Sequence, residues 1–233
     1  MKLILKKSQP EIDDVHTFIF EPETPLTWQA GQYFQYHLPH QSADERGEKR
    51  WFTIASAPYE DFVQVSTRLN HEHSSTFKDQ LTALKPGDSI DVTGPEGDFT
   101  VDDPGRQLVF IAGGIGITPF RSILRDLHHE HKSLHVTLFY ANRNDQFAFR
   151  EDFDALMPEQ PDLHIHYIVS PEQIDAALIH EHVPAIDDAI FFVSGPESMV
   201  DAFKPLLESI GVPSENIKQD WFPGYVWTSE GLK

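Results

Sequence analysis

The sequence predicts a two-domain protein, with a six-stranded antiparallel β-barrel followed by an α/β domain built on a doubly wound parallel sheet. Short, mostly alternating segments rich in β-branched and aromatic residues fill the first hundred positions. Apolar segments that alternate with helical patterns fill the rest. The turn-forming sequence Asp102-Asp103-Pro104-Gly105 separates the two rhythms. We therefore expect domains at residues 1–103 and 104–233.

Six strands and one helix are expected in the first domain, because turn signals such as Lys85-Pro86-Gly87-Asp88 divide it into short segments. The expected strands are Leu3–Lys7, Thr17–Glu21, Tyr33–Leu38, Trp51–Ala55, Val63–Arg68 and Ser89–Thr93. The expected helix, Ser75–Leu84, begins at hydroxyl residues that can cap it and ends before Pro86. This set of elements is typical of a small barrel.

The second domain is expected to alternate strands and helices, as parallel sheets covered on both faces do. The expected strands are Leu108–Ala112, His135–Tyr140, Leu163–Val169, Ile190–Ser194 and Ile217–Phe222. The expected helices are Pro119–His131, Phe149–Leu156, Ile174–His180 and Glu197–Ser209.

Composition limits the kind of protein this is. Hydrophobic residues make up 39% of the 233 positions, which is enough for a substantial core. The formal net charge of −19 repels phosphates, so we expect no nucleic-acid partner. No apolar run reaches the roughly 20 residues of a membrane span. Lysines interrupt the apolar stretch that a signal peptide would need near Met1, so a cytoplasmic protein is expected.

The chain contains no cysteine, which excludes disulfides, thiolate catalysis and iron–sulfur clusters from it. Any iron–sulfur relay must therefore lie on a separate partner. Thirteen histidines raise the question of a metal site, and His71-x-His73 and His128-His129-x-His131 are the closest groups. The first lies in an expected loop and the second at an expected helix end, where imidazoles favourably meet the last carbonyls. With no convergent third ligand type, we expect no metal.

A glycine-rich segment, Gly113-Gly114-Ile115-Gly116-Ile117-Thr118-Pro119, joins a buried strand to a helix. Glycines let a backbone approach a pyrophosphate, and a helix N-terminus supplies free N–H groups and a positive dipole end. Thr118 suits the N-cap position and Pro119 the first helical position. The pattern is not Gly-x-Gly-x-x-Gly, so a nucleotide site and a tight turn needed for packing remain alternatives.

A second segment, Arg50-Trp51-Phe52-Thr53, places a cation, two aromatic rings and a hydroxyl on one barrel strand. A flavin needs an aromatic plane against its ring, a hydrogen-bond donor near N5 and cations on its phosphates. An ordinary amphipathic strand is the alternative. Further on, His73–Lys78 offers hydroxyls and free amides at a helix start, as either an anion site or a plain N-cap.

In series, these motifs resemble those of the ferredoxin–NADP⁺ reductase family. Arg50–Thr53 resembles its Arg-x-Tyr/Phe-Ser/Thr flavin motif, and Gly113–Pro119 its Gly-Gly-x-Gly-x-Thr-Pro nucleotide motif. Ser194-Gly195-Pro196 is similar to its Cys/Ser-Gly-Pro segment beside the nicotinamide, and Ile217–Tyr225 to its closing Ile-x-x-Glu-x-Phe-x-Gly-Tyr. The matches run in family order from Gly31-Gln32-Tyr33 to Tyr225.

The resemblance implies a flavin barrel, a nicotinamide-nucleotide domain and an active site between them, with FAD more often than FMN. On the flavin side, Arg50 would contact phosphate, Phe52 next to Trp51 would stack on the isoalloxazine, and Thr53 would hydrogen-bond near N5. Ser74, Ser75 and Thr76 at the helix start are implied to hold the flavin pyrophosphate. Thr67 and Arg68 on the preceding strand are weaker candidates for flavin contact. The implied nucleotide contacts are Gly113, Gly114, Gly116, Thr118, Pro119, Ser194, Gly195 and Pro196.

The implied catalytic residues are Thr53, Ser194, Asp220 as an acid or proton relay, and Tyr225 as a movable cover of the flavin. Three positions depart from the family. Phe52 lacks the phenol often found there, Asp220 replaces a glutamate, and Ser194 replaces the commoner cysteine. Phe52 can therefore still stack on the flavin but cannot make the hydrogen bond of a phenol. The Asp220 side chain reaches one methylene less far than a glutamate, and Ser194 removes any effect of a thiol on hydride transfer.

These observations predict an FAD-dependent oxidoreductase that takes hydride from NADH or NADPH and passes electrons to a separate acceptor. That acceptor would be a ferredoxin- or flavodoxin-like protein, another redox partner or a small molecule. A flavin reductase that releases reduced flavin, and a non-catalytic flavin subunit or sensor, are the alternatives. Arg143 after the second strand favours NADPH slightly, although Pro171 stands where the family's phosphate-binding arginine would be.

Overall fold

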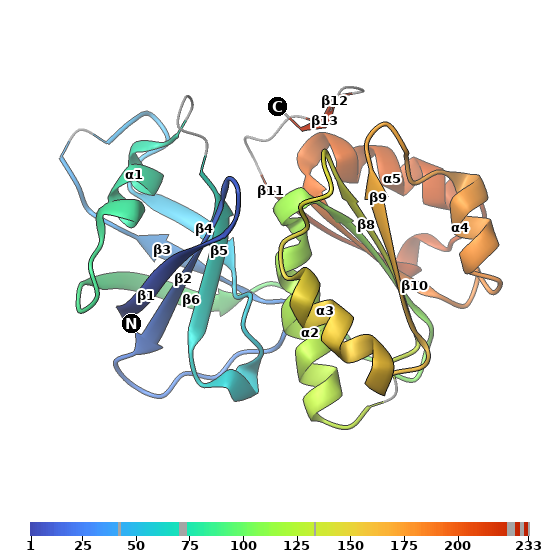
Figure 1. Ribbon diagram of the computed structural model, residues 1–233, viewed down its shortest axis with the longest axis horizontal. Helices are drawn as coiled ribbons and strands as arrows, with labels where there is room; N and C mark the ends of the chain where they lie inside the picture. The colour runs from blue at the N-terminus through green and yellow to red at the C-terminus, as the bar shows by residue number, and fades with distance from the viewer. Residues whose placement is uncertain (42, 70–73, 133, 223–226, 229–230, 233) are drawn as a thin grey trace.

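Two sheets organise the protein, one antiparallel in the first half of the chain and one parallel in the second. The computed structural model describes residues 1–41, 43–69, 74–132, 134–222, 227–228 and 231–232. Figure 1 shows the two halves side by side, with the helices α2 (Thr118–His129) and α3 (Arg150–Leu156) on the side of the parallel sheet nearer the barrel. The predicted two-domain fold class is confirmed.

The antiparallel sheet has the strand order β4-β3-β6-β1-β2-β5 and encloses an apolar core that includes Phe18, Phe34 and Phe77. Its strands are β1 (Lys2–Ile12), β2 (Val15–Pro22), β3 (Tyr33–His37), β4 (Lys49–Thr53), β5 (Val63–Arg68) and β6 (Ser89–Glu96). The short helices η1 (Pro58–Glu60) and α1 (Thr76–Ala83) complete this half. The sheet curls towards closure, because Ala55 just beyond β4 donates its N–H to the carbonyl of Gln64 on β5 at 2.8 Å.

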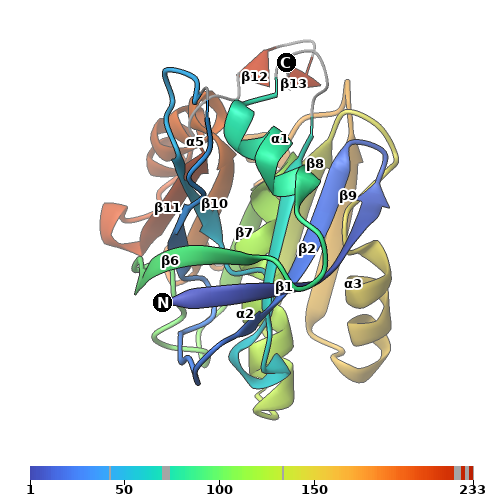
Figure 2. The ribbon, with the colours of Figure 1, turned by 90° about the vertical axis from the view of Figure 1, so that its left-hand side faces the viewer.

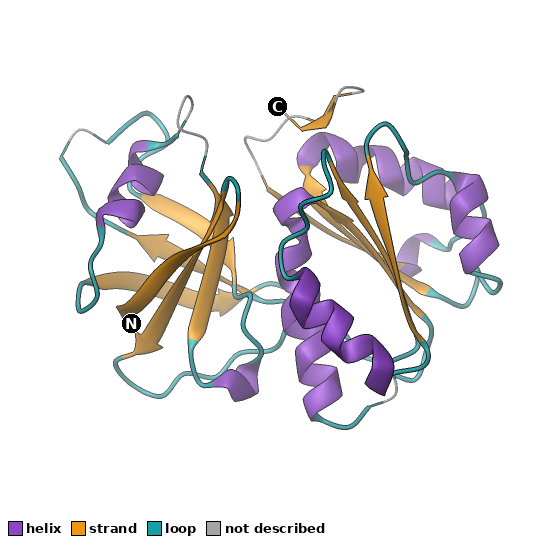
Figure 3. Ribbon diagram, in the orientation of Figure 1, coloured by secondary structure: helices purple, strands orange, loops and turns teal. Residues whose placement is uncertain are grey.

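The parallel sheet has the order β11-β10-β7-β8-β9. Its strands are β7 (Leu108–Gly113), β8 (Val136–Asn142), β9 (Leu163–Val169), β10 (Ile190–Pro196) and β11 (Ile217–Phe222). The helices α2 and α3 pack against one face around Phe110 and Phe120, whereas α4 (Ala176–His182) and α5 (Glu197–Ser209) pack against the other around Ile179 and Phe203. Figure 3 shows this helix–sheet–helix layering, and the 3-10 turns η2 (Gly114–Ile117), η3 (Met157–Glu159) and η4 (Ser214–Asn216) lie at the connections. Two short strands, β12 (Trp227–Thr228) and β13 (Gly231–Leu232), pair near the end of the chain.

Several element ends differ from those expected, for local reasons. The first strand continues past Lys7 to Ile12, because it forms a long hairpin with β2. The strand expected to reach Ala55 ends at Thr53, since Ala55 bonds to β5 and leaves the β3 ladder. The helix expected from Ile174 begins at Ala176, because the Asp175 carboxylate accepts a hydrogen bond from the Leu178 amide at 2.9 Å and caps it.

The segment that joins the two sheets runs between Glu96 and Leu108. The predicted domain boundary at residue 103 falls within it and stays a prediction. None of the helices in the described parts of the chain combines the length and apolar character that a membrane crossing requires.

Candidate functional site

The glycine turn, defined as residues 113–117, lies where the winding of the parallel sheet reverses. The strands β7 and β10 are neighbours, and the helices that follow them cover opposite faces of the sheet. The glycine turn follows β7, and Ser194-Gly195-Pro196 ends β10. Ligands of open α/β folds bind in the crevice at such a reversal, beyond the carboxyl ends of the strands. The structure thus brings together two segments that lie about eighty residues apart in the sequence.

The glycines of this turn meet neighbouring groups closely. A Cβ atom at Gly116 would lie 2.3 Å from the Ser194 carbonyl oxygen, and one at Gly113 would lie 2.3 Å from the Met199 sulfur. Gly114 has φ +54°, in the left-handed region. Packing against backbone therefore requires glycine at position 116, and backbone conformation favours it at position 114, whereas at position 113 the nearest atom belongs to a flexible methionine side chain. The contact of these glycines with a nucleotide remains a prediction.

The expectation that Thr118 caps the helix is wrong. The turn η2 continues directly into α2, so Thr118 is the first helical residue and Pro119 the second. The Thr118 hydroxyl donates to the Ile115 carbonyl at 3.1 Å and accepts no hydrogen bond from the helix start. Because the turn η2 runs directly into α2, the helix begins one residue earlier than expected. Ile117 therefore occupies the N-cap position, where its side chain makes no capping hydrogen bond.

Ser194 and Asp220 occupy paired positions on β10 and β11. The Ser194 hydroxyl is buried and has no hydrogen-bond partner within the part of the chain that the structure describes. Asp220 is partly buried, and burial together with the negative charge of Asp98 raises its pKa to about 7. On β3, Tyr33 has its pKa raised by burial and by the charges of Glu96, Asp220 and Asp98. A barrel residue is therefore near enough for the Asp220 charge to act on it, a proximity that sequence reasoning did not find.

The barrel strand β4 carries the aromatic motif as predicted by alternation. The Phe52 ring packs partly into the barrel core, with centroid distances of 5.5 Å to Tyr36 and 5.9 Å to Phe77. Trp51 lies on the other face of the strand and is 54% exposed. Thr53 ends the strand and is buried.

Arg50 and the start of α1 converge on a carboxylate of the chain itself. The Thr76 amide donates to Asp44 at 3.1 Å, and the Arg50 Nη2 atom lies 3.5 Å from the other Asp44 oxygen. That Nη2 atom is buried without a hydrogen-bond partner among the described residues, while Nη1 donates to the carbonyls of Arg46, Gly47 and Lys49. A hydrogen bond from Arg46 is the largest of the effects that lower the pKa of Asp44 to about 2. The groups at this end of the barrel therefore favour an anion, and Asp44 supplies one.

Ser74 and Ser75 have partners within the chain. The Ser75 hydroxyl accepts from the Lys78 amide at 3.2 Å, as an N-cap does, and the Ser74 hydroxyl lies 3.4 Å from the Ser75 carbonyl. The capping alternative therefore accounts for Ser75.

The weaker candidate cations pair with one acidic turn. Arg68 donates to Asp14 at 2.8 Å from the end of β5, next to the buried Thr67. Arg143 on the nucleotide half lies 3.6 Å from the same carboxylate, and its side chain is 40% exposed. The turn between β1 and β2 thus joins charges from both halves of the molecule.

Tyr225, like His71 and His73, lies outside the described residues, so its predicted role as a cover of the flavin stays a prediction. Among the residues that are described, no group of three or more His, Asp or Glu side chains is arranged to hold a metal ion.

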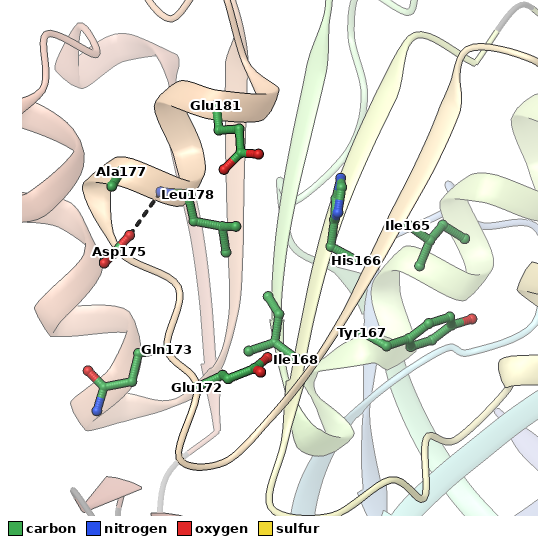
Figure 4. Close-up of a pocket in the computed structure, with 10 residues that line it drawn as sticks. All are labelled: Ile165, His166, Tyr167, Ile168, Glu172, Gln173, Asp175, Ala177, Leu178 and Glu181. Atoms are coloured by element: carbon green, nitrogen blue, oxygen red, sulfur yellow. Dashed lines mark hydrogen bonds between the residues drawn. The ribbon is translucent and has the colours of Figure 1, made fainter.

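A hollow of about 670 Å³ lies between β9 and α4, at the outer edge of the parallel sheet (Figure 4). His166 lines it, and its ring centroid lies 3.9 Å from that of His182, with the two ring planes tilted by 37°. None of the residues predicted for the site lines this hollow.

Comparison with known proteins agrees with this arrangement. The oxidoreductase NAD-binding domain family matches residues 110–204. The FAD/NAD-binding domain of nitric oxide dioxygenase from Vibrio cholerae superposes with a TM-score of 0.82 at 24% identity, over 95% of this chain and 98% of that one. Ferredoxin–NADP⁺ reductase from Plasmodium falciparum superposes with a TM-score of 0.80 at 17% identity, over 95% of both chains.

The chain has the fold of ferredoxin–NADP⁺ reductase, and its residues 110–204 belong to the oxidoreductase NAD-binding domain family. A Na⁺-translocating NADH-quinone reductase subunit of Neisseria gonorrhoeae is 31% identical over 199 residues, which are 75% of this chain and 49% of the relative. The corresponding Yersinia enterocolitica protein is 34% identical over 160 residues, or 62% of this chain and 39% of the relative. The chain thus spans less than half the length of these curated relatives. These matches agree with the resemblance predicted from the sequence, whereas the activity of the whole protein and the roles of individual site residues stay predictions.

Proposed function

We propose that this chain is a member of the ferredoxin–NADP⁺ reductase family. As such it is an FAD-dependent oxidoreductase that takes hydride from NADH or NADPH and passes electrons to a separate acceptor. The observation that carries the proposal is the contact of the glycine turn with Ser194 at the reversal point of an oxidoreductase NAD-binding domain. The barrel beside it presents Arg50, Phe52 and Thr53 on one strand. Similar structures include a flavohemoglobin with bound FAD and an FAD/NAD-binding domain of a nitric oxide dioxygenase, which supports this cofactor pair.

The barrel residues suit a flavin in shape and charge. Phe52 offers a ring that is only partly buried, and Thr53 places a hydroxyl at the end of the same strand. The buried Nη2 atom of Arg50 lacks a hydrogen bond that a phosphate oxygen would supply. Asp44 would have to share or leave this end of the barrel when a phosphate binds, because two like charges would meet there.

The nucleotide side suits a nicotinamide in the same way. Ser194 holds a buried hydroxyl with no partner, beside Asp220, whose pKa of about 7 lets it hold a proton near neutral pH. When bound, the flavin supplies the hydride acceptor and can release electrons singly or in pairs. The protein would align the two rings, exclude water and keep a proton on Asp220 within reach of the site.

The electron acceptor differs among the similar proteins, whose names include a quinone reductase component, a nitric oxide dioxygenase and a ferredoxin reductase. We therefore propose a separate redox protein or small molecule as acceptor, with any iron–sulfur centre on that partner, since the chain has no cysteine. A cytoplasmic location remains part of the proposal. Release of reduced free flavin is the second candidate function, and the carboxylate of Asp44 at the phosphate end favours it by opposing tight flavin binding.

Identification of the bound cofactor tests this proposal. The purified protein should stay yellow through gel filtration, and heat release followed by chromatography should give FAD. Recovery of FMN, or rapid loss of flavin on dilution, would favour the flavin-reductase function. A protein that binds no flavin even when FAD is added would contradict the proposal.

A further inference from the structure

A buried group of charges joins the two halves of the molecule next to the proposed site. We call Arg121 and Arg125 of α2, Glu60 of the barrel and Asp152 of α3 the interdomain cluster. Arg121 lies 3.0 Å from Glu60 and 2.6 Å from Asp152, and Arg125 lies 3.0 Å from Glu60. The side chains of Arg121 and Glu60 are each only 7% exposed. Figure 2, viewed from the barrel side, shows α2 directly behind the barrel.

Arg121 also bonds to the barrel backbone. Its Nη1 atom donates to the Ala55 carbonyl at 2.8 Å, and the next residue, Ser122, donates its hydroxyl to the Ser56 carbonyl at 2.7 Å. The barrel holds the other side of this segment, because the Ala55 amide bonds to β5 and the Trp28 indole donates to the Ser56 carbonyl. The backbone at residues 55 and 56 is therefore fixed between the two domains.

The bonds between Arg121 and the barrel link the flavin half of the proposed site to its nucleotide half. Ala55 lies two residues after Thr53, the proposed N5 contact, and Arg121 lies one helical turn after the glycine turn. Both connecting stretches, Ile54–Ala57 and Thr118–Arg121, are buried along their whole length. A shift of α2 against the barrel would thus change the distance between flavin and nicotinamide.

We propose that Arg121 is a positioning residue for hydride transfer, which sets the spacing of the Thr53 strand end and the glycine turn through its bonds to Ala55 and Glu60. This inference rests on the proposed function. Hydride transfer requires an approach of roughly 3–3.5 Å, and a misplacement of about 1 Å can slow a reaction a hundred-fold. The Arg121 guanidinium keeps its positive charge in this buried position. Burial lowers its pKa, but the negative charges of Asp152 and Glu60 outweigh burial, so the pKa of Arg121 is raised.

The test is single-turnover reduction of the bound flavin by NADH and by NADPH in Arg121→Met, Arg121→Lys and wild type. Arg121→Met should be reduced about ten-fold or more slowly, with a larger primary isotope effect from C4-deuterated nucleotide. Its flavin content and its reduction by dithionite should match wild type. Arg121→Lys, which keeps the charge but not the fork of donors, should fall between. Arg150→Met is the matched control, because Arg150 is half-exposed and pairs with Asp154 on its own helix.

Hydrogen exchange gives a second readout that needs no turnover. The amides of residues 54–60 should exchange faster in Arg121→Met and stay unchanged in Arg150→Met. If Arg121→Met fails to fold, flavin reduction and hydrogen exchange are measured instead in Ser122→Ala and Arg121→Lys, where we expect the same changes at a smaller size. Reduction of Arg121→Met within two-fold of wild type, or an equal slowing with dithionite, would overturn the inference. A wild type that neither nucleotide reduces would instead refute the proposed function, and unchanged exchange at 54–60 would then refute the interdomain connection as well.

Discussion

The two ends of the proposed site are prepared for their ligands in opposite ways. At the barrel end, the groups that suit a phosphate already meet a carboxylate, since Thr76 and Arg50 both contact Asp44. At the nucleotide end, the Ser194 hydroxyl is buried without any partner, and the backbone is packed too tightly to accept a Cβ atom at Gly116. The comparison predicts that flavin binding competes with an internal charge, whereas nucleotide binding depends on a rigid shape. Five substitutions would break or sharpen it.

Gly116→Ala should have the largest effect, because its methyl group would lie 2.3 Å from the Ser194 carbonyl oxygen. Overpacking of this kind destabilises by about 1–3 kcal/mol, and the shift would move the two segments of the nucleotide end apart. Thermal unfolding and nucleotide titration should both show a loss. Gly105→Ala is the control, since among the described residues its methyl group would meet a side-chain atom, the Asp103 Oδ1 at 3.2 Å, and no backbone. Equal nucleotide affinity in both variants would show that the turn serves packing alone.

Thr53→Ala should slow flavin reduction by ten-fold or more while keeping the fold and the flavin. A positioned donor of this kind is worth ~2–4 kcal/mol when lost, and Thr53 is buried where the strand ends. Stopped-flow reduction by the preferred nucleotide measures the change, and Thr53→Ser, which retains the hydroxyl, should stay close to wild type. Unchanged reduction of Thr53→Ala would remove Thr53 from the site.

Asp220→Asn should change the pH dependence of stability. The pKa of Asp220 is about 7 in the folded protein, raised by burial and then by Asp98, whereas an unfolded aspartate titrates near 4. The folded state therefore binds more protons between these values, and stability falls as pH rises from about 4 to 7. Asp220→Asn should remove this loss, of about 1–3 kcal/mol after allowance for partial exposure. Unfolding midpoints at pH 5 and pH 8 should converge in the variant, and parallel curves would contradict the assignment.

Arg143→Ala tests the slight preference for NADPH. We expect a several-fold lower kcat/KM for NADPH and little change for NADH, because a guanidinium pairs well with the 2′-phosphate. The effect should be modest, since Arg143 already lies 3.6 Å from Asp14. Steady-state kinetics with both nucleotides decide it, and a higher kcat/KM for NADH that Arg143→Ala leaves unaffected would show that the preference is wrong.

Asp44→Asn should have the smallest effect, a few-fold tighter binding of FAD. Removing the charge relieves its repulsion of the flavin phosphates, while the amide oxygen can still accept from Thr76. Fluorescence titration of the flavin-free protein measures the affinity, with the exposed Asp188→Asn as control. Weaker binding in Asp44→Asn would mean that the carboxylate orders the flavin site instead of opposing the flavin.

Sequence patterns located the elements whose signals are local. The strands β5, β9 and β11 and the helix α5 have the bounds that alternation and helical spacing predicted. Alternation also separated Trp51 from Phe52 on β4. Thr118 was misplaced because a cap pattern does not reveal the 3-10 turn that precedes the helix.

Contacts between distant residues could not be predicted in this way. Arg121 lies 61 positions from Glu60 and 31 from Asp152, and each residue alone resembles an ordinary surface charge. The meeting of Asp44 with Thr76 spans 32 positions and depends on how the loop after β3 folds back. No periodicity carries such pairings, because they depend on how loops fold back and on how elements distant in the sequence pack together.

The most direct test of the central claim, that both ends serve one hydride transfer, is an anaerobic titration of the flavin-loaded protein with its preferred nicotinamide nucleotide. One equivalent of NADPH or NADH should bleach the flavin absorption fully, because each nucleotide delivers one hydride to one flavin. A flavin that dithionite reduces but that neither nucleotide bleaches would contradict the account.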